Sequence, residues 1–313
     1  MSQTTSVSSR LLSSETMAKL ERMELVTRKV FRGRMKGERR SKRRGQSVEF
    51  ADYRNYVPGD DLRFIDWNLF ARLDRLYLKL FLEEEDLHLY TVIDDSLSMS
   101  FGDPSKFWVA KQIAACLGYI GLCHGDRVSI STFSTTHAPL VIRGKSSVHR
   151  LLSMLESSQV QPQSADGSRK TVAENQADHR SMRQAMKSFC LRNQGKGIVV
   201  VITDLLDRDG YESALRMLVA REMDVIVVHL LSPEELSPNL EGDIRLTDCE
   251  DRESVDVSVS APMLERYHAT LNEFLTQAKT FCSRLSINYV PARSDQSAEL
   301  LVNEYLRARG LVR

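Results

Sequence analysis

Three side chains that carry oxygen ligands follow an apolar stretch about a third of the way along the chain. Asp94, Ser96 and Ser98 stand at alternate positions directly after Val92 and Ile93. One turn of chain can therefore present a carboxylate and two hydroxyls together. Such oxygen ligands suit Mg²⁺ or Mn²⁺, which favour octahedral oxygen coordination and keep bound water. The spacing predicts a divalent-cation site, and the choice between Mg²⁺, Mn²⁺ and Ca²⁺ stays open.

A second carboxylate, Asp204, follows Thr203 after the uninterrupted apolar run 197–202. That run is typical of a central parallel strand buried on both faces. Ligands of such sheets bind at the carboxyl ends of the strands, so Asp204 would join Asp94 in the metal site if the two strands are neighbours. Two adjacent acids need a cation or hydrogen-bond donors to offset their repulsion. The alternative interpretation is that the serines only cap a turn and that loop amides bind Asp94.

The elements that would position these side chains alternate between strand and helix from residue 87 onward. The strands are predicted at 87–93, 127–133, 137–142, 197–202, 225–231 and 287–290, and the helices at 106–123, 148–155, 181–192, 211–221, from 260 onward and 298–307. This order predicts an α/β fold with a mostly parallel sheet flanked by helices. Segment 232–259 breaks the alternation with Pro, Gly and acidic residues. We interpret it as an inserted hairpin within a domain that spans 87–313.

Residues 46–86 are predicted to form a small antiparallel β element before the sheet. Segments 48–56 and 62–67 are short and apolar, and Pro58 followed by Gly59 between them suits a type II turn. Alternating apolar residues then predict a further strand in 76–82.

Residues 1–45 are predicted to hold a helix and a basic arm. Ser13 or Ser14 can cap a helix whose apolar residues recur at near-helical spacing, and we expect this helix to pack on the main body. The apolar residues concerned are Met17, Leu20, Val26 and Val30.

The composition is that of a globular chain. Of the 313 residues, 42% are hydrophobic and 27% are charged, and no stretch reaches the about 20 apolar residues of a membrane span. The first ten residues lack the apolar core of an export signal. The five cysteines are scattered and favour reduced core thiols. We therefore expect a cytoplasmic protein that does not cross a membrane.

The net charge of +1 conceals a basic run. Segment 28–44 holds ten Lys or Arg residues against the single acid Glu38. Such a run can bind nucleic acid or an anionic membrane surface, or it can be a solvated arm. Phe31 is its only aromatic residue, which argues against nucleic-acid binding. Binding to a nucleic acid or a membrane surface through this arm stays as an alternative function.

Two motifs carry a resemblance to known families. Asp94-x-Ser96-x-Ser98 together with Thr203-Asp204 resembles the metal-ion-dependent adhesion site of von Willebrand factor A domains. The upstream motif, which resembles the signature of the bacterial family called domain of unknown function 58, reads Glu49-Phe50, Arg54-x-Tyr56-x-Pro58-Gly59-Asp60-Asp61-x-Arg63-x-Ile65-Asp66-Trp67 and Ala71-Arg72.

The resemblance covers nearly all of the chain from about residue 44 onward. It implies a von Willebrand factor A-like, Rossmann-like fold in a bacterial, cytosolic protein. Members are commonly encoded beside MoxR-type AAA+ ATPases and are thought to act with them in a chaperone-like or metal-insertion role. The resemblance thus implies such an ATPase as partner.

One position departs from the adhesion-site pattern. Such sites take a further ligand, usually Thr, from a loop before the helix that precedes the central strand. Here Arg180 stands close to that place, and the nearest hydroxyls are those of Ser181 and Thr171. If Arg180 occupies the place, its guanidinium could neutralise Asp94 and Asp204 instead of a metal.

The charged residues of the upstream signature predict ion pairs. Arginines and aspartates alternate there around apolar residues, and planar guanidinium groups paired with carboxylates would pin the antiparallel element to the sheet. The alternative is that these residues grip a partner. Trp67 is predicted to lie in the core. The residues concerned are Arg54, Arg63, Arg72, Asp60, Asp61 and Asp66.

We expect a non-catalytic protein. No histidine stands beside the acids, His229 falls within a predicted buried strand, and the chain has no Gly-rich phosphate loop and no G-x-S-x-G motif. The alternative is a metal-dependent hydrolase with Asp204 as base. Our working hypothesis is that the bound cation leaves one coordination position open for a carboxylate of another protein.

Overall fold

The computed structural model forms two compact units. One consists of Met1–Lys29 and Leu87–Arg313, and the other of Val30–Asp86. The residues that the structure describes are 11–25, 49–82, 87–137, 140–160, 181–193, 195–240, 242–249 and 254–306. In these ranges, no helix combines the length and the apolar character needed to cross a bilayer.

The larger unit is built on a six-stranded sheet with the order β10-β7-β6-β3-β4-β5. Only β5 runs antiparallel, against β4, which confirms the predicted mostly parallel sheet. The strand predicted at 137–142 corresponds to β5, which is shorter and begins only at Val141. The strands are β3 (His88–Ile93), β4 (Arg127–Thr132), β5 (Val141–Arg143), β6 (Ile198–Thr203), β7 (Asp224–Leu231) and β10 (Asn288–Arg293).

The strand order reverses between β3 and β6. From β3 the chain adds β4 and β5 on one side, and then it returns to add β6, β7 and β10 on the other side. In doubly wound sheets such a reversal marks the crevice where ligands bind, at the carboxyl ends of the strands. The register pairs Ile93 with Ile202, so Asp94 and Thr203 follow at the same edge.

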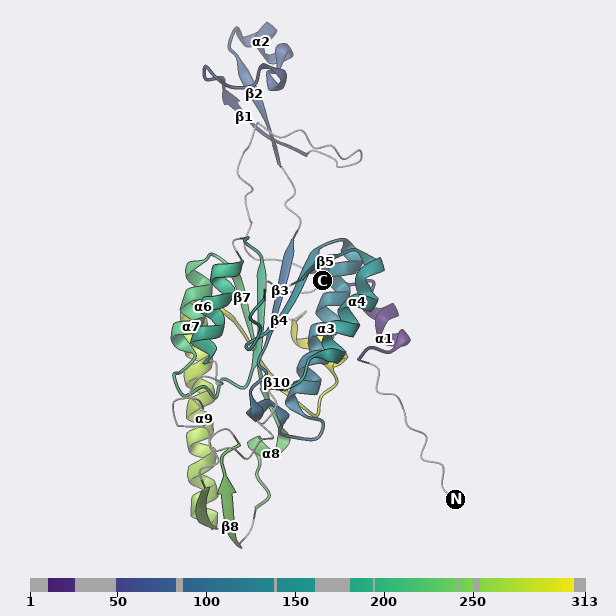
Figure 1. The fold of residues 1–313 in the computed structure, drawn as a ribbon. Helices are drawn as coiled ribbons and strands as arrows, with labels where there is room; N and C mark the ends of the chain where they lie inside the picture. Colours follow the sequence, from purple (N-terminus) through teal and green to yellow (C-terminus); the bar gives the residue numbers. More distant parts are fainter. Residues whose placement is uncertain are drawn as a thin grey trace, which may run out of the picture. The chain divides into compact units, whose positions relative to one another are not determined.

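Helices cover both faces of this sheet (Figure 1). The apolar side chains form two clusters, one on each face, which confirms the predicted flanking helices. One face carries α1 (Ser14–Leu20), α3 (Lys106–His124), α4 (Val148–Ser157) and α10 (Ala298–Leu300), the last continuing as a π-helix over Leu301–Leu306, and the other carries α6 (Met182–Arg192), α7 (Glu212–Ala220) and α9 (Ala261–Arg284).

The most deeply buried elements are β6, β7 and α3. Every residue of both strands is buried, as the continuous apolar runs predicted. The N-terminal helix α1 begins after Ser13, whose side chain accepts from the amide of Thr16. Its Leu20 is fully buried in the cluster that contains α3, which confirms that this helix packs on the main body. Val26 and Val30 lie outside the described residues.

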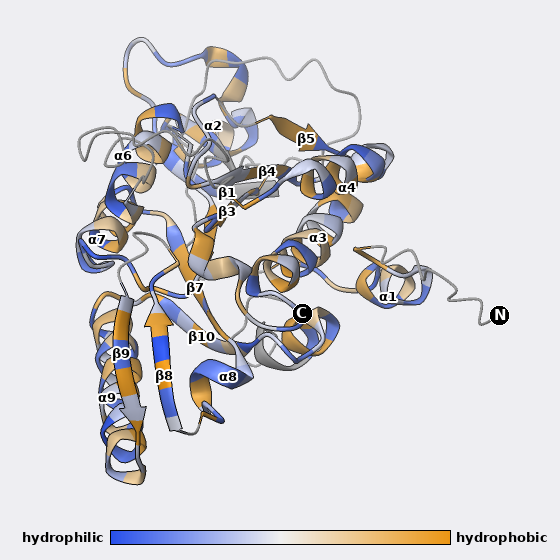
Figure 2. Cartoon of the chain, turned by 60° about the horizontal axis from the view of Figure 1, so that its bottom comes forward, coloured by the Kyte–Doolittle hydropathy of each residue, from blue (hydrophilic) through white to orange (hydrophobic). Residues whose placement is uncertain are grey.

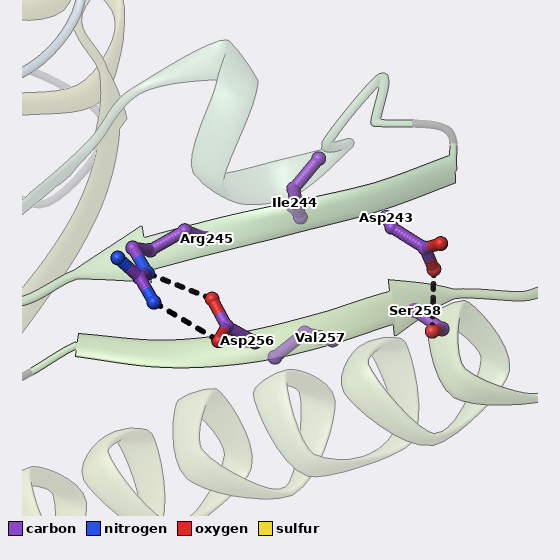
Figure 3. A pocket seen from close by; sticks show the side chains of 6 residues that line it. All are labelled: Asp243, Ile244, Arg245, Asp256, Val257 and Ser258. Atoms are coloured by element: carbon purple, nitrogen blue, oxygen red, sulfur yellow. Dashed lines mark hydrogen bonds and ion pairs between the residues drawn. The ribbon is translucent and has the colours of Figure 1, made fainter.

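A hairpin follows β7 and the short helix α8 (Pro233–Leu236). Its strands β8 (Gly242–Thr247) and β9 (Ser254–Val259) pair antiparallel and alternate in hydropathy along their length (Figure 2). Figure 3 shows a pocket on this pair, in which Arg245 donates to both carboxylate oxygens of Asp256, at 2.7 and 3.1 Å. The Ser258 hydroxyl donates to Asp243.

The smaller unit is an antiparallel pair with short helices between its strands. β1 (Glu49–Asn55) pairs with β2 (Tyr77–Leu82), and η1 (Leu62–Phe64) and α2 (Trp67–Leu73) lie between them. The prediction of a strand at 62–67 is therefore wrong. The reason is helix capping. Asp61 accepts from the amide of Arg63, and Asp66 accepts from the amides of Asn68 and Leu69.

Trp67 is 60% exposed, so the prediction that it lies in the core is wrong. Only Ile65 and Leu78 are buried among the apolar residues whose burial is described in this unit. A unit of this size has too little volume to bury all of its large side chains.

A substitution tests how closely the sheet is packed. A Cβ atom at Gly197 would overlap the carbonyl oxygen of His88, whereas one at Gly118 would meet only the flexible end of Leu151. We expect Gly197→Ala to lower the free energy of unfolding by about 1–3 kcal/mol. Gly118→Ala should cost less, because alanine also favours the helix. Urea denaturation of both variants makes the comparison, and an equal cost for both would contradict this packing.

Candidate functional site

The carboxyl ends of β3 and β6 bring the predicted acidic residues together. The amide of Asp94 donates to the carbonyl of Ile202 at 2.9 Å, and the hydroxyl of Thr203 donates to Asp94 Oδ2 at 2.6 Å. Asp94 is 5% exposed and Asp204 is 1% exposed. The two strands are neighbours, which meets the condition under which Asp204 was expected beside Asp94.

The loop after β3 gathers the remaining oxygen atoms of the motif. Asp94 Oδ1 accepts from the amide of Ser96 at 3.0 Å, and the hydroxyls of Ser96 and Ser98 lie 2.9 Å apart. Ser96 precedes the short helix η2 (Leu97–Ser100), but its side chain makes no capping hydrogen bond. A loop amide does bind Asp94, as the alternative interpretation held, while the hydroxyls of Ser96 and Ser98 bond to each other.

Burial makes the ionised form of Asp94 costly. Its removal from water raises the pKa of Asp94 above the usual range, and repulsion from Asp204 raises it further. Hydrogen bonds from Thr203 and Ser96 offset only part of this effect. A divalent cation beside the carboxylate would reverse the balance, because it is the strongest local charge that a site can hold.

Asp204 has a permanent cationic partner inside the protein. The ammonium of Lys106, the first residue of α3, lies 2.8 Å from Asp204 Oδ2 and 2.5 Å from Glu235 Oε1. The Lys106 side chain is fully buried. Burial lowers the pKa of Lys106, but the two carboxylates outweigh burial and raise it above its ordinary value. Lys106 is therefore charged, and its ion pairs connect the start of α3 with the end of β6 and with α8.

Among the described residues, the formal charges of this region do not cancel. Asp94, Asp204 and Glu235 are acidic, and Lys106 is the basic residue that lies among them. With every acid ionised the group carries two excess negative charges, which equals the charge of one divalent cation. Asp95 stands apart, because its carboxylate accepts from the amide and the hydroxyl of Ser134.

The candidates for a further ligand are only partly described. Arg180 and Thr171 lie outside the described residues. Ser181 caps α6 and accepts from the amide of Gln184 at 3.4 Å. The next residue, Met182, donates its amide to Asp207 in the loop after β6. The start of α6 is thus fixed to the loop that carries Asp204, but no hydrogen bond joins Ser181 to either site carboxylate.

Sequence reasoning missed Lys106 and Glu235. One signal for Lys106 was its place in the first turn of a helix, where the helix dipole disfavours a positive charge and a nearby carboxylate is needed. Glu235 forms a capping box with Ser232, in which each side chain bonds the backbone amide of the other. Its remaining oxygen binds Lys106, 129 residues away in the sequence. That separation hides the contact from any local pattern.

His229 and three of the cysteines are buried in the core. His229 is fully buried, its Nδ1 lies 2.6 Å from the Tyr289 hydroxyl, and burial lowers its pKa to about 4. Of the cysteines, Cys116, Cys190 and Cys282 are buried. Within the described ranges no three His, Cys, Asp or Glu side chains gather as a metal-binding group. A cation at Asp94 would therefore depend on the serine hydroxyls.

The signature residues of the smaller unit form local ion pairs. Arg54 binds Asp60 at 2.5 Å, and Arg63 binds Asp61. These pairs stay within the unit, so the prediction that they pin it to the sheet is wrong for them. The physical reason is that the partners of each pair are close in sequence, six residues apart for Arg54 and Asp60 and two apart for Arg63 and Asp61.

The remaining signature residues shape the turn and its flanks. Gly59 adopts a φ of +106°, and the amide of Asp60 donates to Val57 across the predicted turn. The amide of Tyr56 donates to Leu76 at 2.9 Å, and Arg72 is exposed on α2. Asp66 caps α2 and also pairs with Lys79 at 3.1 Å, and this partner holds its pKa at about 2.

Comparison with known proteins places the chain in a family. Residues 52–274 match the family described as Protein of unknown function DUF58. The chain belongs to this family. Uncharacterized proteins of Mycobacterium bovis and of two strains of Mycobacterium tuberculosis are each 25% identical to it over 235 residues, which is 74% of this chain and 70% of theirs. The match to the DUF58 family covers most of the smaller unit and also the strand ends that carry Asp94 and Asp204.

The buried triad gives a stability prediction. Lys106→Met would leave Asp204 and Glu235 without their cation, so we expect the free energy of unfolding to fall by about 3–5 kcal/mol. The matched control is Lys196→Met, which removes an exposed pair with Glu222 and should cost about 1 kcal/mol or less. Urea denaturation measures both. Equal small losses would contradict the importance given to Lys106.

Proposed function

We propose that this DUF58 protein is a non-catalytic interaction module with a von Willebrand factor A-like fold that binds a partner through a divalent cation. The observation that carries the proposal is the buried carboxylate of Asp94, which has hydrogen-bond donors but no cationic partner among the described residues. Its neighbour Asp204 has Lys106. The position also favours a ligand site, because it lies where the strand order reverses.

Mg²⁺ or Mn²⁺ is the cation that the donor atoms suit. Asp94 and the hydroxyls of Ser96 and Ser98 would hold it. Asp204 is less available, because Lys106 occupies one of its oxygens and the amide of Leu206 donates to the other at 3.1 Å. Asp204 would therefore act mainly through its charge or through a water molecule. Because few protein side chains hold the ion, coordination positions remain for water and for a ligand.

A carboxylate of a partner protein is the ligand that such an open position favours, because hard cations prefer oxygen ligands. The resemblance to the family points to a MoxR-type AAA+ ATPase as the partner and to a chaperone-like role. Among the described residues, no histidine side chain is hydrogen-bonded to the carboxylate of Asp94 or Asp204, which favours a binding function over hydrolysis. His229 is neutral at pH 7 and is held in the core by Tyr289.

Calorimetric titration of the EDTA-stripped protein with Mg²⁺ and Mn²⁺ tests the cation site. We expect saturable binding at one site that Asp94→Ala abolishes. Thr203→Val, which removes the hydroxyl that orients Asp94, should weaken binding by about 10–100-fold. Asp209→Asn is the matched control, because this exposed acid follows the same strand and should leave affinity unchanged. If folded wild-type protein binds neither ion, the cation site does not exist.

A second experiment tests the partner. Immobilised protein should retain a purified MoxR-type ATPase in the presence of Mg²⁺ and release it on addition of EDTA. Asp94→Ala should remove the interaction, and Asp209→Asn should preserve it. If neither EDTA nor Asp94→Ala changes the retention, the cation does not mediate the contact, even if the ATPase is the correct partner.

A further inference from the structure

The smaller unit exposes an unusual share of large apolar side chains. Six of the seventeen exposed large hydrophobic residues of the described chain lie in its 34 described residues, 49–82. They are Tyr53, Val57, Leu62, Trp67, Phe70 and Leu73. Scattered apolar residues on a surface need no explanation, but such a concentration marks an interaction surface.

Three of these side chains form a stripe along α2. Trp67, Phe70 and Leu73 recur at steps of three residues, so they lie on one side of the helix. They are 60%, 36% and 53% exposed. The rings of Trp67 and Phe70 contact edge to face, with centroids 6.2 Å apart. The α2 stripe is therefore a preformed aromatic surface, of the composition found at binding hot spots.

The ion pairs of the smaller unit share one arrangement of their charges. In each of the three ion pairs among the described residues of this unit, the basic side chain is more exposed than its acidic partner, at 42% against 19%, 66% against 21% and 37% against 8%. The bases point outward and the acids lie beneath them. The bases are Arg54, Arg63 and Lys79.

Two further arginines flank the stripe. Arg72 lies on α2 and Arg75 just after it, both are exposed, and neither has an ion pair with a described residue. Arginine side chains of this kind bind carboxylates through paired hydrogen bonds. Among the described residues, the exposed charge of this unit is thus mainly basic, which favours a partner that presents acids.

We propose that the α2 stripe docks a segment of a partner protein that combines apolar side chains with carboxylates. The apolar residues would cover Trp67, Phe70 and Leu73, and the carboxylates would meet the surrounding bases. A protein fits better than a bilayer or a nucleic acid, because Asp74 is exposed beside the stripe and gives the surface mixed signs. A uniformly anionic ligand would meet repulsion there. This surface belongs to a different unit from Asp94 and is independent of any cation.

Site-specific photo-crosslinking in cells that naturally make the protein tests this docking surface. A photoreactive phenylalanine analogue replaces Phe70, and the matched control carries it at Leu191, which is 67% exposed on α6 in the larger unit. We expect position 70 to give a protein adduct whose mapped segment holds apolar residues and at least two carboxylates. Adding Leu73→Ser should reduce its yield to the control level.

Three results would overturn the proposal. The first is a yield at position 70 no higher than at position 191. The second is adducts with lipid or nucleic acid alone, or with a protein segment that lacks acids. The third concerns the purified protein with Trp108→Phe, in which Trp67 is the only tryptophan. If acrylamide fails to quench its fluorescence, the stripe is already covered and offers no docking surface.

Discussion

A positive charge is buried inside this protein because the strand ends around it carry carboxylates. Lys106 binds Asp204 and Glu235 at distances that leave no room for water between the charges. Burying charges costs several kcal/mol for each ion, and close partners are what offset the cost. The three residues come from α3, β6 and α8, so their mutual attraction ties distant parts of the chain to one edge of the sheet.

The ion pairs of Lys106 also leave part of the negative charge at the site unbalanced. Among the described residues, Lys106 alone cannot balance three acids. Asp94 accepts hydrogen bonds from Ser96 and Thr203, whereas Asp204 also has the charge of Lys106. A divalent cation at Asp94 would complete the balance, beside the half-buried serines Ser96 and Ser98. The α2 stripe in the smaller unit would bind by different chemistry, because it presents apolar side chains flanked by arginines. Two surfaces with different chemistry are consistent with the proposed role in binding other proteins.

Much of the larger unit was predictable, because short continuous apolar runs bounded by turn residues favour central strands and because strands alternating with helices imply parallel pairing. The approach of Asp204 to Asp94 followed from the same rule. Lys106 was not predictable in this way, since its partners are 98 and 129 residues away. The prediction of a strand at 62–67 was wrong because six residues are too few for periodicity to outweigh the Asp66 cap. The prediction that Trp67 is buried was wrong because burial depends on how large a core the unit can form, and a local sequence pattern does not report that size.

The most direct test of the cation site is diffraction from crystals soaked in Mn²⁺, with data collected at the manganese absorption edge. The account predicts an anomalous peak about 2.1–2.2 Å from an Asp94 carboxylate oxygen and from the hydroxyls of Ser96 and Ser98, with Lys106 still bound to Asp204. A site without such a peak, in which a protein side chain such as Arg180 supplies the positive charge to Asp94, would contradict it.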